Sequence, residues 1–470
     1  MKVLYASSEA LPFAASGGLA DVAGSLPRAL RGRKIACRVV MPYYSTISEE
    51  LKAKCKYLLN FTVELGWRKQ YCGVFTANVG GVVYYLLDNE YYFKRNNLYG
   101  EFDDGERFAF FSKAVLDLIS HIDFKPDIIH CNDWQTGLIP VYLNAFYRNI
   151  EKYRYIKTIF TIHNIQYQGK FSSFVAGDVF GLSDNFNNIL EYDGCINVLK
   201  AAMQESDRIT TVSDSYSKEI LSPDFAFGLS DFLNNNSFKL SGILNGIDME
   251  LYNPRTDKKI AANFSENDLS GKEKCKEELL KEFGLSYKKD TPVIAMVTRL
   301  VHAKGISLVR EVFEKLMTRD VRFILLGSGD KEYEEFFEEM RRKYPEKVGV
   351  YIGFSPKTAS KVYAGADIFL MPSLSEPCGL AQMVALLYGT IPIIHEVGGL
   401  RDTIKDCSLG EGNGFTFNYF HGDTLLNTID NALRVYGNKE DWKKLMETAL
   451  KSDFSWKKSA EKYINTYKEL

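Results

Sequence analysis

The chain has 470 residues, of which 25% are charged and 46% hydrophobic, a composition typical of globular proteins and not of long disordered ones. At about 150 residues per domain, this length predicts two to three domains. The formal net charge of −2 excludes a strongly basic nucleic-acid footprint over the whole chain, although it leaves room for a local basic site.

Short apolar segments alternate with helical patterns through the first half of the chain. Apolar residues recur at helical spacing over 19–30 and 108–120, which predicts two helices. The predicted strands are 2–6, 38–41, 82–87, 128–130, 158–163 and 208–212. Because helices separate the strands and polar loops follow them, the pattern predicts a doubly wound α/β domain with a parallel sheet.

The same alternation starts again after a more polar segment, 252–290, which lacks clear strands and is interpreted as the join between two halves. The further predicted elements are strands 293–297, 323–326, 348–352, 368–371 and 391–394, and helices 272–283, 305–317, 332–343 and 456–467. The expected domains are 1–244 and 245–455, with a C-terminal helix in 456–470 that packs back on the first domain. Ligands of such folds bind outside the carboxyl ends of the strands.

The sequence predicts a cytoplasmic protein that binds neither membrane nor nucleic acid. Glu9 interrupts the N-terminal apolar run too early for a secretory signal. The longest uncharged apolar stretch, 377–394, is interrupted by Gly379, Gly389 and Pro392, which favours a buried helix followed by a buried strand. The eight cysteines stand singly, without C-x-x-C or zinc-finger spacing, and this favours a reducing compartment and no metal.

Two glycine-containing loops follow predicted strands. Gly17-Gly18 precedes a helix, whose free N–H groups could hold a phosphate or a sugar; a simple tight turn is the alternative. Gly327-Ser328-Gly329 resembles the start of a dinucleotide fingerprint, but Glu332 stands where the third glycine belongs. We interpret the second loop as an ordinary strand-to-helix turn.

Charged residues follow two strands of the second half. Arg299 and Lys304 could bind a diphosphate leaving group, on which negative charge develops in the transition state. Alternatively, they could be two solvated charges. Glu376 precedes a helix expected to begin near Leu380, and could face a ligand or be a surface or capping charge. Cys378 lacks the partner pattern of a nucleophile and is interpreted as a small buried thiol.

Polar residues also follow strands of the first half. His130, Asp133 and His163 stand at or after predicted strand ends, beside asparagines, so they could be site residues. A single histidine near a core is more often a structural residue with satisfied hydrogen bonds. The Asn245-Gly246-Ile247-Asp248 turn, taken alone, indicates only structure.

Together these motifs resemble one family, the bacterial glycogen synthases and plant starch synthases that use a nucleotide diphosphoglucose donor. The matching segments, in order along nearly the whole chain, are Ser16-Gly17-Gly18-Leu19-Ala20-Asp21-Val22, His130-Cys131-Asn132-Asp133-Trp134, Thr161-Ile162-His163-Asn164, Phe227-Gly228-Leu229, Gly242-Ile243-Leu244-Asn245-Gly246-Ile247-Asp248, Arg299 with Lys304-Gly305, Glu376-Pro377-Cys378-Gly379-Leu380 and Gly398-Gly399-Leu400.

The resemblance implies two Rossmann-like domains of GT-B architecture that face each other across a cleft holding the active site. It implies transfer of glucose from ADP-glucose to the non-reducing end of an α-1,4-glucan, with retention of anomeric configuration and with no metal or cofactor. Because no separate carbohydrate-binding module is visible, contacts with the glucan must use the first domain's own surface.

The resemblance also assigns roles to single residues. Glu376 holds the donor glucose, Arg299 and Lys304 bind the diphosphate, the main-chain carbonyl of His163 lies near the anomeric carbon, and Asp133 completes the catalytic set. The implied donor-binding residues further include Gly17, Gly18, Asp21, Phe354, Cys378, Gly379 and Leu380, with Phe354 against the base. The implied sugar or acceptor residues are Tyr99, Asp133, His163, Asn164 and Asn245.

One departure from the family pattern concerns the donor. Ala15 stands where the family has a lysine that contacts donor phosphate, and a lost contact of this kind costs about 1.5–3 kcal/mol if nothing replaces it. His395 also replaces a residue that is often basic. Two alternative functions therefore remain: a synthase that prefers UDP-glucose, and a glucan-binding protein without catalytic activity. An oxidoreductase is disfavoured by the missing third glycine, and phosphorylase chemistry by the lack of an identifiable pyridoxal lysine.

Overall fold

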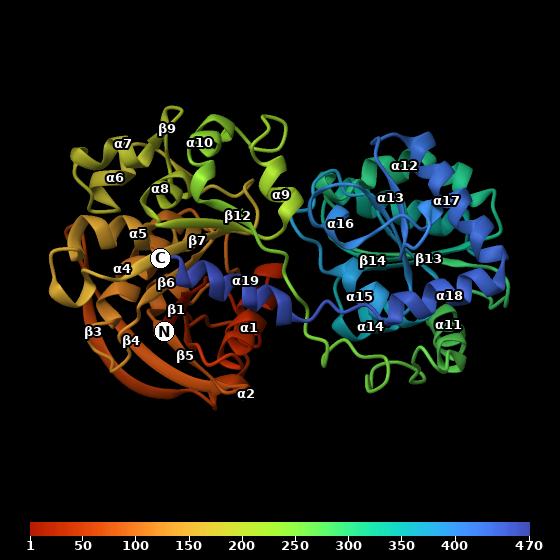
Figure 1. Cartoon of the computed structure of the whole chain (residues 1–470), viewed down its shortest axis with the longest axis horizontal. Coiled ribbons are helices and arrows are strands. Elements are labelled where there is room, and N and C mark those ends of the chain that lie inside the picture. The colour runs from red at the N-terminus through yellow and green to blue at the C-terminus, as the bar shows by residue number, and fades with distance from the viewer. The chain divides into compact units, whose positions relative to one another are not determined.

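The computed structural model describes residues 1–470, apart from the side chain of Leu409, and divides the chain into two compact units. Unit 1 comprises Met1–Gly246 and Trp456–Leu470, and unit 2 comprises Ile247–Ser455 (Figure 1). The polar segment 252–290 belongs to unit 2, so its interpretation as a join was wrong. Its helix α11 (Ser270–Glu282) buries Cys275, Leu279 and Leu280 although most of its residues are charged or polar, and it packs against α14 (Pro356–Gly365).

Unit 1 is built on a nine-stranded sheet. Its order is β12 (Leu240–Gly242), β11 (Arg208–Thr211), β7 (Lys157–Ile162), β6 (Ile128–Asn132), β1 (Lys2–Ala6), β2 (Ala36–Pro42), β5 (Val82–Asp88), β4 (Arg68–Val79) and β3 (Lys56–Leu65). The first seven strands in this order run parallel, and β1 pairs with β2 on one side and β6 on the other. The chain therefore changes its direction of progress beside β1, which is where doubly wound sheets bind ligands.

Two long strands of unit 1 are absent from the sequence-based prediction. The strands β3 and β4 form an antiparallel hairpin that extends the sheet beyond β5. One face of this hairpin is largely solvent-exposed, so polar and apolar residues alternate along its strands. The buried parallel strands instead have continuous apolar runs. A second small sheet, also unpredicted, has the order β8 (Lys170–Phe171), β10 (Cys195–Asn197) and β9 (Glu191–Tyr192).

The helices of unit 1 include a segment from the far end of the chain. They are α1 (Gly18–Arg31), α2 (Glu49–Lys52), α3 (Glu90–Phe93), α4 (Asp104–Leu118), α5 (Leu138–Tyr142), α6 (Val175–Asp178), α7 (Asn187–Leu190), α8 (Val198–Glu205), α9 (Asp214–Glu219), α10 (Ser230–Asn235) and α19 (Trp456–Lys468). Helix α19, blue in Figure 1, lies beside the red α1. It buries Trp456, Tyr463 and Tyr467 against unit 1.

Unit 2 contains a six-stranded parallel sheet. Its order is β15 (Val348–Ile352), β14 (Arg322–Gly327), β13 (Val293–Val297), β16 (Ile368–Met371), β17 (Ile391–His395) and β18 (Phe415–Phe417). Numbered within the unit, this is the order 3-2-1-4-5-6 of the Rossmann fold. The predicted fold class, two doubly wound Rossmann-like α/β domains, is therefore confirmed.

The remaining helices of unit 2 are α12 (Ile306–Met317), α13 (Lys331–Lys343), α15 (Ala381–Leu387), α16 (Gly398–Thr403), α17 (Gly422–Gly437) and α18 (Lys439–Leu450). The uncharged stretch 377–394 forms the buried α15 and then the buried β17, as predicted. Gly327-Ser328-Gly329 forms the turn between β14 and α13, also as predicted, and its backbone packs against Leu300.

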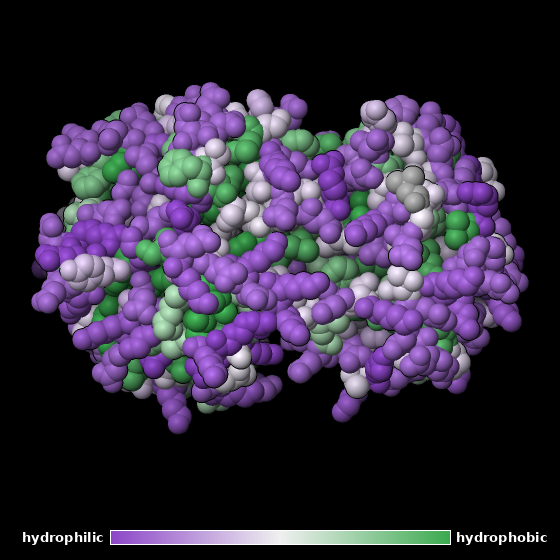
Figure 2. Space-filling view, viewed as in Figure 1, coloured by the Kyte–Doolittle hydropathy of each residue, from purple (hydrophilic) through white to green (hydrophobic). Residues whose placement is uncertain are grey.

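In the part of the chain that the structure describes, no helix is long and apolar enough to cross a membrane. On the face drawn in Figure 2, hydrophobic residues form separate patches that hydrophilic side chains border. The eight cysteines are all free thiols, and five of them are buried.

Candidate active site

The carboxyl ends of the central strands of unit 1 bring several predicted site residues together. Asp133 follows β6 and His163 follows β7, while Ser8 and Glu9 follow β1. Because these three strands are parallel neighbours, their ends meet at one edge of the sheet.

Asp133 has an unusual backbone and a perturbed carboxyl group. Its φ of 56° and ψ of 173° lie in a region that non-glycine residues rarely adopt, at a cost of about 1–3 kcal/mol. Its Oδ1 accepts the backbone N–H of His163 at 2.7 Å. Burial raises the pKa of Asp133 to about 7, even though N–H groups of His163 and Asn164 favour the charged form. Strain of this kind is concentrated at functional sites.

The His163 ring is held in one protonation state. Its Nε2 lies 2.9 Å from Oδ1 of Asn132, which also accepts the Tyr5 hydroxyl at 2.9 Å. Since Nδ2 of Asn132 donates to the Ala6 carbonyl at 2.9 Å, Oδ1 is the acceptor and Nε2 of His163 carries the proton. Burial lowers the pKa of His163 to about 3, so the ring is neutral at physiological pH. A neutral ring of this kind orients the backbone and does not supply a positive charge.

His130 is structural. It is fully buried, and its two ring nitrogens contact the hydroxyls of Tyr467 at 2.7 Å and Thr161 at 2.6 Å. Burial lowers its pKa to about 3. The Tyr467 contact ties α19 to the centre of the unit 1 sheet.

Glu9, which the sequence reasoning missed as a site residue, supports the Gly17-Gly18 loop. Its buried carboxylate accepts the backbone N–H of Ser16 at 2.6 Å, and burial raises its pKa to about 6. Next to it, the Ser8 hydroxyl contacts the Tyr99 hydroxyl at 2.7 Å. Tyr99 is thereby joined to the same edge. The available signal for Glu9 was a carboxylate three residues after the first strand, in the loop that leads to Gly17-Gly18.

The other predicted residues of unit 1 differ in exposure. Gly17 and Gly18 are exposed at the start of α1, which also carries Asp21. Oδ1 of Asn164 accepts the Gln166 N–H at 3.0 Å in a local turn. Asn245 is only 5% exposed, and its Oδ1 has no hydrogen-bond partner among the residues that the structure describes. An unsatisfied buried acceptor of this kind indicates a missing donor, such as a ligand hydroxyl.

In unit 2, the structure joins Lys304 to Glu376. Nζ of Lys304 lies 2.6 Å from Oε2 of Glu376, and the buried Ser373 hydroxyl donates to the same oxygen at 3.2 Å. Lys304 follows β13 and Glu376 follows β16, the two strands at which the sheet order reverses. Gly305 allows the approach: its φ is 70°, and a Cβ there would lie 1.9 Å from the Pro372 carbonyl oxygen.

The loop that carries Glu376 is fixed on both sides. The Glu376 carbonyl accepts the Gly399 N–H at 3.1 Å, and Nε2 of Gln382 donates to the Gly379 carbonyl at 2.8 Å. Cys378 is buried, as predicted, while Gly379 and Leu380 are partly exposed just before α15. The backbone of this loop is therefore set before any ligand arrives.

His395, whose role the sequence left open, holds the strand beside that loop. Its Nδ1 lies 2.8 Å from the Ser373 carbonyl, and its ring packs against Phe417 and Phe420 at centroid distances of 5.1 and 5.4 Å. Burial lowers its pKa, so it acts as a neutral packing residue.

Two predicted residues of unit 2 stand apart from the Lys304–Glu376 pair. Arg299 is exposed two residues after the end of β13. Phe354 is 75% exposed after β15, two strands away from β13. Neither side chain is part of the hydrogen-bonded cluster around Glu376.

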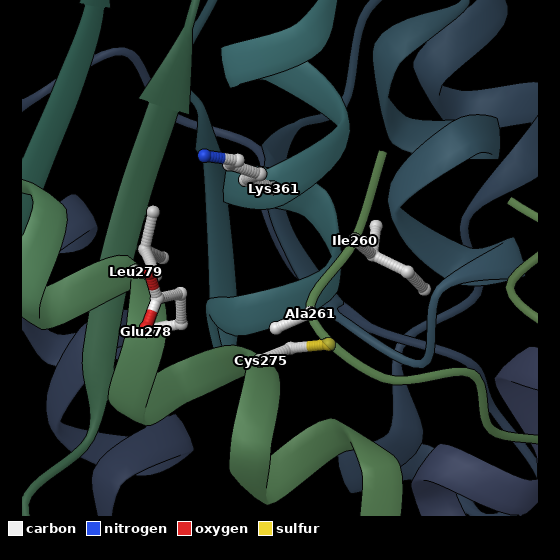
Figure 3. Close-up of a pocket in the computed structure, with 6 residues that line it drawn as sticks. All are labelled: Ile260, Ala261, Cys275, Glu278, Leu279 and Lys361. Atoms are coloured by element: carbon white, nitrogen blue, oxygen red, sulfur yellow. The ribbon is translucent and has the colours of Figure 1, made fainter. Parts of the chain in front are cut away.

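A small pocket elsewhere in unit 2 is not a substrate site. It has a volume of about 10 Å³, room for about one water, and Figure 3 shows its lining residues Ile260, Ala261, Cys275, Glu278, Leu279 and Lys361. Among the residues that the structure describes, no group of three His, Cys, Asp or Glu side chains could hold a metal ion.

Comparisons with known proteins agree with this architecture. Residues 2–235 match the starch synthase catalytic domain family, and residues 279–452 match the glycosyl transferases group 1 family. The chain is 49% identical to a glycogen synthase of Bacillus cereus (strain Q1) over 100% of both chains. It is 47% identical to one of Clostridium botulinum (strain Alaska E43 / Type E3), over 100% of this chain and 99% of the relative.

A solved structure is similar throughout. The catalytic domain of starch synthase IV from Arabidopsis thaliana, bound to ADP and acarbose, matches with a TM-score of 0.93 and 31% identity, over 99% of this chain and 98% of that one. Fold, family matches and relatives together define a glycosyltransferase with two Rossmann-like domains. The chain belongs to the glycogen and starch synthase family.

The pKa of Asp133 makes stability depend on pH. Unfolded aspartate titrates near 3.9, so between about pH 4 and pH 7 the folded state binds more protons than the unfolded state. The free energy of unfolding contributed by this group therefore falls as pH rises through that window. We expect Asp133→Asn to lose this dependence, so that its stability relative to the wild type increases from pH 4.5 to pH 7.5. Urea unfolding at several pH values measures this difference, and a constant difference would contradict the assignment.

Proposed function

We propose that the protein transfers glucose from ADP-glucose to the non-reducing end of an α-1,4-glucan, with retention of anomeric configuration. The observation that carries the proposal is the Lys304–Glu376 pair, at the point where the order of the unit 2 sheet reverses. There a carboxylate for sugar hydroxyls lies next to a cation for phosphate. The ADP and acarbose bound by the Arabidopsis relative support a nucleotide donor and a glucan-like acceptor.

In this proposal, Lys304 and Arg299 stabilise the leaving diphosphate. Breaking the glycosidic bond moves negative charge onto the diphosphate, and fixed cations lower the free energy of that transition state. Lys304 has three N–H donors, so it can contact phosphate without leaving Glu376. Arg299 is exposed and offers a planar fork for a second phosphate contact. We propose on these grounds that transfer needs no metal or other cofactor.

Glu376 and the unit 1 residues act on the sugar. Glu376 accepts hydroxyls of the donor glucose, and the loop through Cys378, Gly379 and Leu380 provides backbone groups near the phosphate. The carbonyl of His163 stabilises the positive charge that develops at the anomeric carbon. Asp133 and its N–H donors fix the position of that carbonyl. Asn245 and Tyr99 complete the sugar site, and the free Oδ1 of Asn245 accepts a sugar hydroxyl.

The remaining donor contacts are assigned by family resemblance. We propose that Gly17, Gly18 and Asp21 contact the donor from unit 1, that Phe354 packs against its base, and that Asn164 belongs to the sugar side. Unit 1 then serves the acceptor and unit 2 the nucleotide sugar. The eight free thiols support a cytoplasmic location.

Donor preference tests the proposal, because Ala15 removes a phosphate contact. Initial rates with ADP-glucose and UDP-glucose, at saturating glycogen and with EDTA present, should favour ADP-glucose. Since Ala15 is exposed, Ala15→Lys should fold normally and lower the KM for ADP-glucose about tenfold, as one added charge-assisted contact would.

Ala15→Ser is the matched control and should leave the KM unchanged. Transfer from UDP-glucose alone would contradict the proposed donor. An unchanged KM in Ala15→Lys would show that position 15 does not reach the phosphates, and dependence on added Mg²⁺ would contradict metal-independent transfer.

A further inference from the structure

Tyr99, proposed above to complete the sugar site, lies in a loop whose backbone is held by a buried ion pair. Asp104 begins α4, and Arg107, whose side chain is fully buried, follows one turn later. Nη1 of Arg107 donates to Oδ1 of Asp104 and, at 3.2 Å, to the Leu98 carbonyl. Oδ2 of Asp104 accepts the Gly100 N–H at 2.8 Å. The pair therefore holds both the residue before Tyr99 and the residue after it.

The Arg107 guanidinium also ties this loop to a neighbouring helix. Its Nε donates to the carbonyl of Tyr92, in α3, at 2.7 Å. A planar guanidinium has donors in fixed directions, so it can hold several acceptors in one geometry, which the single nitrogen of a lysine cannot do. Gly100 completes the turn with a φ of 90°, in the left-handed region that glycine adopts easily. The backbone around Tyr99 therefore follows one defined path.

The Tyr99 side chain is placed beside the candidate active site. Its hydroxyl contacts the Ser8 hydroxyl at 2.7 Å, just after β1. Its ring centroid lies 5.9 Å from that of Phe108, which in turn lies 5.3 Å from the Trp134 ring. Since Trp134 directly follows Asp133, these contacts join Tyr99 to the catalytic edge of the unit 1 sheet.

Stability alone does not account for the buried ion pair. Burying two charges costs free energy that their attraction often fails to recover, and apolar side chains of similar volume are often at least as stable. Nη2 of Arg107 is also buried without a hydrogen-bond partner among the residues that the structure describes, which adds to this cost. A costly pair with hydrogen bonds on both sides of a site residue favours a role in positioning that residue.

We infer that Arg107 and Asp104 are positioning residues, which set the place of Tyr99 for glucosyl transfer. The inference rests on the sugar site proposed above. Arg107 is buried and does not contact the substrate, so it acts through Tyr99. Loss of the ion pair displaces Tyr99, and small displacements of groups that contact the substrate lower turnover strongly.

A double-mutant cycle with Tyr99 tests the inference. Arg107→Lys keeps the charge but not the fork of donors. We expect it to fold, as judged by circular dichroism, and to lower kcat/KM for transfer to glycogen about tenfold. In a Tyr99→Ala background the same substitution should change kcat/KM less than about twofold, because the side chain that Arg107 positions is absent. Asp104→Asn should show the same dependence on Tyr99.

The matched control is Arg322→Lys. Arg322 is another buried arginine, at the start of β14 in unit 2 and so at the opposite end of that strand from the loop that follows it. Its substitution should lower the free energy of unfolding without changing kcat/KM. If Arg107→Lys does not fold, the double variant Asp104→Asn with Arg107→Met leaves no unpaired charge and takes its place in the cycle.

The ratios are measured with whichever of ADP-glucose and UDP-glucose is turned over, so they do not depend on the proposed donor. If neither is turned over, the proposed reaction is wrong, and the Kd of acarbose, which the Arabidopsis relative binds, is measured through the same cycle with the same expected pattern. Equal losses with and without the Tyr99 side chain would overturn the inference, by showing that Arg107 only stabilises the fold. An unchanged kcat/KM in Arg107→Lys, or no binding of acarbose by a wild type without turnover, would also overturn it.

Discussion

Replacing Glu376 with glutamine is expected to lower kcat about 1,000-fold while the protein stays folded. Glutamine keeps the size of the side chain but removes the charge that pairs with Lys304 and receives the hydroxyl of Ser373. The Glu376 backbone should stay in place, because its carbonyl accepts the Gly399 N–H independently of the side chain. Transfer of labelled glucose to glycogen, with circular dichroism as the check on folding, measures the effect.

The matched control is Glu332→Gln. Glu332 is an exposed carboxylate of unit 2 that pairs with Arg310 on the surface, and surface pairs contribute little. Its kcat should equal that of the wild type. Near-normal turnover in Glu376→Gln would remove Glu376 from the catalytic assignment.

Replacing Lys304 with methionine should affect both catalysis and stability. The variant loses a phosphate contact, and kcat/KM for the donor should fall about 100- to 1,000-fold. It also leaves the carboxylate of Glu376 buried without its cation, which should lower the free energy of unfolding by about 2 kcal/mol. Steady-state kinetics and urea unfolding measure the two effects separately.

The double variant Lys304→Met with Glu376→Gln separates the two causes. Because no unpaired charge remains, most of the lost stability should return, while activity should not. The exposed Lys315→Met is the control for removal of a lysine from unit 2. Recovery of activity in the double variant would contradict the catalytic assignment of both Lys304 and Glu376.

The site was predictable where it depends on strand order. Residues that directly follow parallel strands lie at one edge of the sheet. Asp133 and His163, or Lys304 and Glu376, could therefore be expected together from sequence position alone. The hydrogen bonds that fix these residues could not be predicted in this way. Asn132 meets the Tyr5 side chain, 127 residues away in sequence, only after the sheet has formed.

Alternation of elements predicted both parallel sheets but missed the β3–β4 hairpin. The hairpin has one exposed face and a Gly66-Trp67 turn that lacks the usual Asn-Gly or Asp-Gly signal. The segment 252–290 was misread because charged residues dominate α11, although three of its apolar side chains are buried. Local composition did not reveal that packing, which depends on contact with α14.

The most direct test of the account is the incorporation of radiolabelled glucose from ADP-glucose into glycogen by the wild type and by Glu376→Gln. We expect label in the wild-type product, about 1,000-fold less in the variant, and release of that label by an exo-acting enzyme that removes α-linked glucose from non-reducing ends. Label that this enzyme cannot release, or equal incorporation by the two proteins, would contradict the proposed reaction and the role of the Lys304–Glu376 pair.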